Sequence, residues 1–195
     1  MVGGRRAPRA PEARIRGQAI HSALSAFSTL HGADAMKQVV ASLPEPIGPT
    51  LRDAELKTAG WYPLPWLRIV HRVAREVSGE DVTLSRKLGF AATQADARGI
   101  YNPLLSFVDP SQLFRHAERV LELYVEGPAV TVHFADRGHA EATFEAMNGA
   151  DESIWMNILG ATEGLISLAG GIDATAAVIG GGGDEPRAVI GFSWS

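Results

Sequence analysis

The C-terminal part of the chain predicts a β-hairpin, a long helix and a second hairpin. In order, it comprises an alternating apolar and polar run at 129–134, a turn at Asp136-Arg137-Gly138, an alternating run at 140–146, an apolar helical run at 152–169, and extended runs at 172–179 and 187–194. Alternation with a period of two on both sides of a turn is typical of half-buried antiparallel strands. In the first run we expect Val130, Val132 and Phe134 on the buried side. A helix between two such hairpins can bury its apolar side against their sheet.

The residues before this region predict a layer of helices. Apolar residues recur at spacings of three and four, and prolines and glycines break the pattern into segments. We expect helices at 16–30, 33–43, 66–77 and 111–124, two more within 81–108, and a short extended piece at 14–18. The predicted fold is therefore α+β, with an N-terminal helical layer packed on a C-terminal antiparallel sheet of two hairpins that are joined by a long helix.

Arginines are concentrated at the N-terminus. Four of the 18 basic residues lie within positions 1–14, against one of the 22 acidic residues. Together with Gly3, Gly4, Pro8 and Pro11, this composition predicts a disordered basic tail at 1–14, followed by a single α+β domain at 15–195. The domain itself is acidic, so nucleic acid is not expected as a partner, because contacts to phosphates require a basic face.

Composition sets the expected location and excludes thiol chemistry. The chain is 46% hydrophobic and 21% charged, as in ordinary globular proteins. It has no cysteine, which excludes disulfides and zinc–thiolate sites. No apolar run is long enough to span a membrane, and no signal peptide opens the sequence. We therefore expect a cytoplasmic protein without a membrane span.

The sequence contains no recognisable catalytic motif, and we predict a protein that is not an enzyme. The glycine-rich stretch 180–183 is followed by Asp184-Glu185-Pro186 instead of the Lys-Ser or Lys-Thr of a phosphate-binding loop. We interpret it as a hairpin loop. The pair Asp151/Glu152 stands at a helix start, where carboxylates complement the helix dipole.

Three of the six histidines, in two places, suggest ligand binding, and each place has a simpler interpretation. His133 and His139 could help to bind a metal with Glu141, but histidines on a hairpin are usually solvated. His71 lies beside an apolar helix stripe, where a hydrogen-bonded core histidine is the simpler alternative to an axial haem ligand. We predict no metal site, and the cofactor is unknown.

Aromatic residues and one amide are the candidate ligand-binding residues. Trp61, Tyr62 and Trp66 place three large rings within six residues, and such a cluster either lines a pocket or anchors the core. Asn157 lies inside an apolar helix, where a buried amide needs a partner and could orient a ligand.

Several short segments resemble a family of myxobacterial proteins of similar length. They are Arg16-Gly17, Trp61-Tyr62-Pro63-Leu64, Arg98-Gly99-Ile100-Tyr101 and the closing Phe192-Ser193-Trp194. That family is distantly similar to the superfamily of haem-NO-binding domains, 4-vinyl-reductase-type domains and small subunits of the transport protein particle (TRAPP). The resemblance implies helices over an antiparallel sheet with a cavity between them, and in many members a homodimer.

The resemblance does not transfer a known site. The Tyr-x-Ser-x-Arg motif with which haem-NO-binding proteins recognise haem follows none of Tyr62, Tyr101 and Tyr124. We therefore predict a non-enzymatic sensory or regulatory module, expected to be a homodimer, that binds a small apolar ligand between helices and sheet. The alternative is a TRAPP-like scaffold or interaction subunit that binds a protein partner without a ligand.

Overall fold

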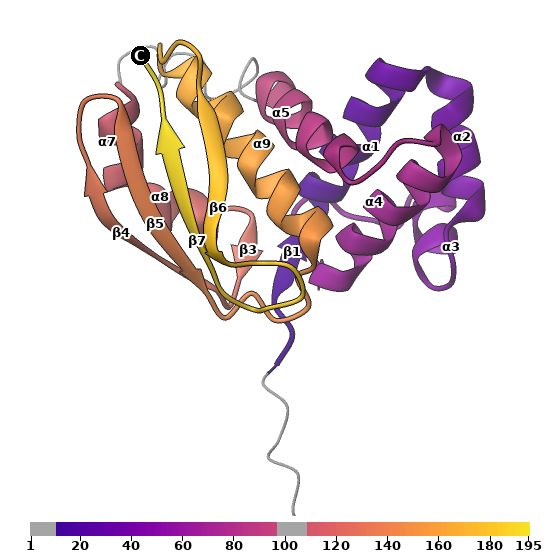
Figure 1. Ribbon diagram of the computed structural model, residues 1–195. Coiled ribbons are helices and arrows are strands. Elements are labelled where there is room, and N and C mark those ends of the chain that lie inside the picture. Colours follow the sequence, from indigo (N-terminus) through magenta and orange to yellow (C-terminus); the bar gives the residue numbers. More distant parts are fainter. Residues whose placement is uncertain (1–10, 97–108) are drawn as a thin grey trace, which may run out of the picture.

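The computed structural model describes residues 11–96 and 109–195. A group of N-terminal helices lies beside a four-stranded antiparallel sheet, and helix α9 (Glu152–Leu168) runs between the two (Figure 1). The predicted α+β class is thus confirmed. The N-terminal helices are α1 (Gly17–His31), α2 (Ala33–Ser42), α3 (Ile47–Arg52), α4 (Leu64–Ser78) and α5 (Thr83–Asp96). The second of the two helices expected within 81–108 falls largely on residues 97–108, outside the described residues.

Each helix boundary follows from a local signal. Helix α2 ends just before Pro44, and α4 begins after Pro63 with Pro65 in its first turn, where a missing N–H is harmless. Gly79 closes α4 in the left-handed region, at a φ of 73°. At the start of α9, the Asp151 carboxylate accepts a hydrogen bond of 3.1 Å from the Ile154 amide.

The C-terminal sheet has the order β4-β5-β7-β6. Its strands are β4 (Ala129–Ala135), β5 (His139–Glu145), β6 (Thr175–Gly181) and β7 (Ala188–Ser193). Helices α7 (Pro110–Arg115), α8 (Ala117–Glu122) and α9 pack on one face of the sheet, as Figure 1 shows behind the strands. Alternate strand residues such as Ala142, Ile190 and Phe192 are buried beneath them.

One side-chain direction within β4 differs from the prediction. Val130 faces the core, but Phe134 is 48% exposed. The register between β4 and β5 shifts between Val132 and Phe134, so that Phe134 pairs with Glu141 instead of continuing the inward series. A bulge inserts one residue and reverses the alternation beyond it. The expectation that Phe134 lies on the buried side was therefore wrong.

A second, three-stranded sheet with the order β2-β1-β3 joins distant parts of the chain. Its strands are β1 (Arg14–Arg16), β2 (Trp61–Pro63) and β3 (Val125–Glu126). Strand β1 confirms the extended piece expected near residue 14. Ala13 is buried, and its amide bonds the Asn148 carbonyl, so the packed part of the chain already includes residue 13. Residues 1–10 of the predicted tail lie outside the described residues.

A hydrogen-bonded ion pair holds α5, α9 and β6 together. The Arg86 guanidinium donates to both carboxylate oxygens of Glu163, with Nε 2.9 Å from Oε2, and to the Ala176 carbonyl. Glu163 in turn accepts the Ala176 amide at 2.8 Å. Because Glu163 is buried, this pair fixes α9 relative to both neighbours.

None of the helices in the described segments is long and apolar enough to cross a membrane.

Candidate functional site

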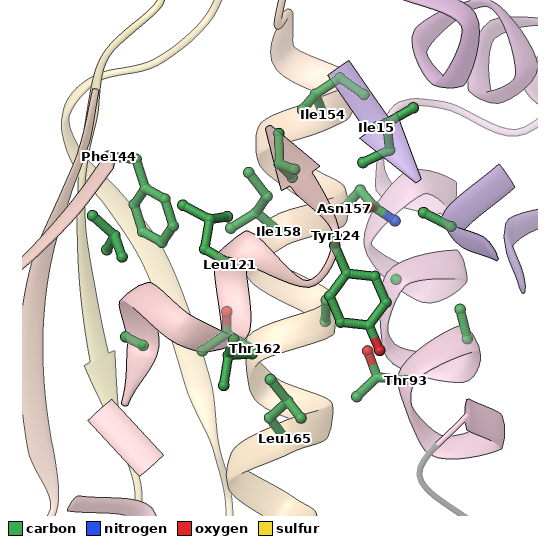
Figure 2. A pocket seen from close by; sticks show the side chains of 18 of the residues that line it. Ile15, Thr93, Leu121, Tyr124, Phe144, Ile154, Asn157, Ile158, Thr162 and Leu165 are labelled. Carbon is green, nitrogen blue, oxygen red and sulfur yellow. The ribbon is translucent and has the colours of Figure 1, made fainter. Parts of the chain in front are cut away.

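A cavity of about 190 Å³ lies between the helices and the four-stranded sheet. Helices α1 and α5 contribute one wall, α9 the second, α7 and α8 the third, and the inner sheet face closes it. Its apolar lining includes Ile15, Ala19, Ala92, Leu113, Phe114, Leu121, Phe144, Met147, Ile154, Ile158, Leu165 and Phe192. Figure 2 shows Phe144 and Leu121 pointing into this space from the sheet side and the α8 side. The site therefore offers mainly apolar contact to a ligand.

Close packing of α5 against α9 shapes one wall of the cavity. A Cβ added to Gly89 would lie 2.2 Å from the Asn157 carbonyl oxygen and 2.9 Å from its side-chain nitrogen. A Cβ added to Gly160 would lie 1.9 Å from the Arg86 carbonyl oxygen. Glycine at both positions lets the helix backbones touch. This close approach places the α9 residues Asn157, Ala161 and Thr162 opposite the α5 residues that line the cavity.

Few polar side chains interrupt the apolar wall. Those in the lining are Ser22, Thr93, Asp96, Tyr124, Asn157 and Thr162. The Asn157 amide makes no hydrogen bond to any described residue. In Figure 2 the Tyr124 ring crosses the space toward α5, and its hydroxyl points toward Thr93. An amide in a mostly apolar cavity that no described residue satisfies is suited to orient a ligand.

Asp96 is the one charged residue among the described lining residues. The Ser22 hydroxyl lies 2.9 Å from both of its carboxylate oxygens, and the Gln18 amide nitrogen donates to Oδ1 at 3.2 Å. Burial raises the pKa of the Asp96 carboxyl, and the hydrogen bonds from Ser22 and Gln18 partly oppose that rise. The group is thus a half-buried carboxylate that is held by neutral donors.

The four residues proposed from the sequence do not lie together. Asn157 lines the cavity, whereas Trp61, Tyr62 and Trp66 are absent from its described lining. The rings of Tyr62 and Trp66 pack against each other with centroids 5.1 Å apart, and the Arg16 guanidinium lies 4.5 Å from the Trp61 ring centre. The Tyr62 hydroxyl accepts a hydrogen bond from the Lys57 amide. A ligand-binding role for these four residues stays a prediction.

Sequence reasoning missed the polar residues of α1 and α5. Gly89, Thr93 and Asp96 follow one another at helical spacing and form a small and polar stripe along α5. Such a stripe would be a usable signal, because a helix face that packs on apolar neighbours normally carries larger apolar residues. Ser22 has no comparable signal.

No histidine lines the cavity, although all six lie within the described segments. His71 is fully buried in α4, and neither ring nitrogen has a hydrogen-bond partner among the described residues, whereas the core histidine that we considered was partly buried and hydrogen-bonded. His133 Nε2 lies 2.7 Å from the Thr143 hydroxyl, and His116 between α7 and α8 is exposed. Across residues 11–96 and 109–195, no three His, Asp or Glu residues are grouped to hold a metal.

The fold of this chain is similar to that of several solved structures. A Cs H-NOX mutant with 4-cyano-L-phenylalanine aligns with a TM-score of 0.69 at 13% identity, over 92% of this chain and 96% of that one. The chain has the H-NOX fold. A K. algicida H-NOX mutant in the Fe(II) unliganded state gives 0.67 at 13% identity, over 92% and 96%. An oxygen-binding H-NOX domain related to soluble guanylate cyclases gives 0.66 at 12% identity, over 92% and 95%.

The sequence adds no closer relationship. No protein-family model matches it, and no curated protein matches it. At 12–13% identity the likeness to H-NOX domains concerns the fold. The similarities to 4-vinyl-reductase-type domains and to TRAPP subunits stay predictions.

Proposed function

We propose that this chain is a sensory or regulatory module that binds a small, largely apolar molecule in the cavity between its helices and its sheet. The observation that carries the proposal is the apolar cavity with the Asn157 amide in its wall, which no described residue satisfies. A volume of about 190 Å³ exceeds the ~150 Å³ that accommodates benzene and falls below the ~300 Å³ of sites for drug-sized ligands.

Haem is the obvious alternative ligand, because one structural neighbour is described as an oxygen-binding H-NOX domain and another by its haem redox potential and porphyrin distortion. The described residues do not fit it. The cavity is too small for a porphyrin, no histidine lines it, and the described lining offers no Lys or Arg for the haem carboxylates. Tyr124 and Met147 are of types that can ligate iron, but Asp96 would repel the carboxylates. We therefore propose a function that does not depend on haem.

The position of the cavity supports a regulatory role. Its wall combines residues of the N-terminal helices, such as Ala23, with residues of the sheet, such as Phe144. A ligand there would contact both parts of the molecule and favour one spacing between them, which is how a ligand shifts a conformational equilibrium. The outer sheet face carries the side chains of Phe134 and Ile179, which are 48% and 60% exposed. A protein partner or a second copy of the chain could bind there when the ligand changes the conformation.

Two measurements test the ligand-binding function. Native and denaturing mass spectra of the purified protein, with an absorption spectrum, should show either a released small molecule or an apoprotein without a Soret band. Ligand-observed NMR should then detect 2-phenylethanol binding to the protein. Ile158→Trp fills the cavity and should abolish binding, whereas the control Ile179→Trp on the exposed face of β6 should leave it intact. A Soret band, or 2-phenylethanol binding that Ile158→Trp leaves unchanged, would contradict the proposal.

A further inference from the structure

The cavity wall contains a carboxylate, that of Asp96, for which the described residues provide no counter-charge. No Lys, Arg or His of the described segments lies within 4.0 Å of the Asp96 carboxylate, and its hydrogen-bond partners are the neutral Ser22 and Gln18. From this we infer that the cavity selects a protonated amine with a small apolar body, the ammonium group pairing with Asp96. The inference rests on the proposed function and names the chemical class of its ligand.

The hydrogen bonds around Asp96 leave room for a further donor. Ser22 has one hydroxyl hydrogen, which it shares between Oδ1 and Oδ2 at 2.9 Å each, and Gln18 donates to Oδ1 alone. A carboxylate can accept about four hydrogen bonds. An ammonium group, with three donors and a positive charge, matches the remaining capacity.

Burial makes the unused hydrogen-bond capacity of the Asp96 carboxylate energetically significant. Ser22 is 7% exposed, and Asp96 is half-buried at the meeting of the start of α1 and the end of α5. Burial raises the pKa of the Asp96 carboxyl, and the hydrogen bonds from Ser22 and Gln18 oppose that rise only in part. A bound cation would supply the missing stabilisation, because charge-assisted hydrogen bonds strengthen where water is excluded.

The rest of the cavity lining determines which apolar body the ligand can carry beside its ammonium group. Beyond the six polar residues named above, the walls are aliphatic and aromatic, and no basic side chain of the described residues faces the cavity. An anionic ligand would meet the Asp96 carboxylate, and no described lining residue would offer it a positive charge. The geometry therefore favours a small aryl- or alkylamine over a fatty acid or another carboxylate.

The test compares three probes of similar size that differ in charge. Isothermal titration at pH 7.5 measures 2-phenylethylamine, 2-phenylethanol and 3-phenylpropionate against the full chain. We expect the amine to bind at least about tenfold more tightly than the alcohol, and the carboxylate to bind most weakly. In Asp96→Asn the ratio of amine to alcohol affinity should fall to about one, while Asp184→Asn, in an exposed loop, should keep the wild-type ratio.

Each outcome separates this inference from the proposed function. Equal amine and alcohol binding to the wild-type protein, or tightest binding of the carboxylate, overturns the amine inference and leaves the cavity function standing. An amine preference that survives in folded Asp96→Asn also overturns it. If none of the three probes binds, the proposed function itself fails. The wild-type series decides the question even where Asp96→Asn does not fold.

Discussion

Gly160 of α9 lies directly against the carbonyl oxygen of Arg86 of α5, at a distance that leaves no space for a methyl group. A Cβ at position 160 would lie 1.9 Å from that oxygen, so one of the two helix backbones would have to move. Because the same two helices form a wall of the cavity, this contact links the stability of the fold to the shape of the site.

Gly160→Ala should destabilise the protein by at least about 2 kcal/mol, since overpacking a close helix contact forces backbone shifts. Urea unfolding followed by circular dichroism measures the change. Gly180→Ala in β6 is the matched control, because its added Cβ would meet only Val189 side-chain atoms at 3.6 Å. Equal stability of the two variants would show that the helices are not in contact as described.

Glu163→Ala should cost about 1.5–3 kcal/mol of unfolding free energy, because it removes charge-assisted hydrogen bonds to an Arg86 side chain that is 34% exposed. The double variant Arg86→Met/Glu163→Leu should be less destabilised than the single variant, since it removes both charges together. Thermal and urea unfolding measure both. The exposed pair Arg72/Glu76 provides the control, and Glu76→Ala should change stability little. If Glu163→Ala were as stable as the wild type, the ion pair of Arg86 and Glu163 would not hold the helices and the sheet together as described.

His71 should make the protein less stable as the pH falls. Burial lowers its pKa to about 4 from 6.5, Arg75 adds to that lowering and Asp151 opposes it. Below pH 6.5 the His71 imidazole is therefore protonated in the unfolded chain, whereas in the folded chain it stays neutral down to about pH 4. Over that interval this one group should remove about 3 kcal/mol of stability.

His71→Leu should remove that pH dependence. It should also add about 1 kcal/mol at pH 7, because neither imidazole nitrogen of His71 has a hydrogen-bond partner among the described residues. Urea unfolding at a series of pH values from 4 to 7 measures both effects, with His139→Gln at an exposed position as the control. A wild-type slope retained in His71→Leu would assign the acid sensitivity to other groups.

Asp96→Asn should stabilise the ligand-free protein at neutral pH. Burial raises the pKa of this carboxyl in the folded state, so its ionisation disfavours folding as the pH rises through that value. The stabilisation should disappear at a pH below the pKa of the unfolded carboxyl, where the group is protonated in both states. Unfolding curves at pH 7 and at acidic pH measure the difference, and a loss of stability at pH 7 would contradict it.

The sequence predicted the elements that carry strong periodicity and missed those that depend on a partner. The alternating runs and the apolar run of α9 gave the sheet, the long helix and their order. Strands β1 to β3 are two or three residues long, too short to show a period, and of these only β1 was anticipated. The bulge that exposes Phe134 is set by pairing with β5, which the residues of β4 do not encode on their own.

The same contrast holds for the site. Asn157 could be found because an amide inside an apolar helix is unusual. Asp96 alone could not, because a single carboxylate on an amphipathic helix is ordinary; only the stripe that it forms with Gly89 and Thr93 was available as a signal. The close helix contact at Gly160 could not be predicted, since a lone glycine in a helix indicates only lower stability until the second helix is in place.

The most direct test of the ligand-binding cavity is a methyl NMR titration of the isoleucine-labelled protein with 2-phenylethanol. The account predicts chemical-shift changes and protein–ligand Overhauser contacts at the cavity residues Ile15, Ile154 and Ile158, with no change at the exposed Ile172 and Ile179. Shifts confined to Ile172 and Ile179, or no shift at any isoleucine, would contradict it.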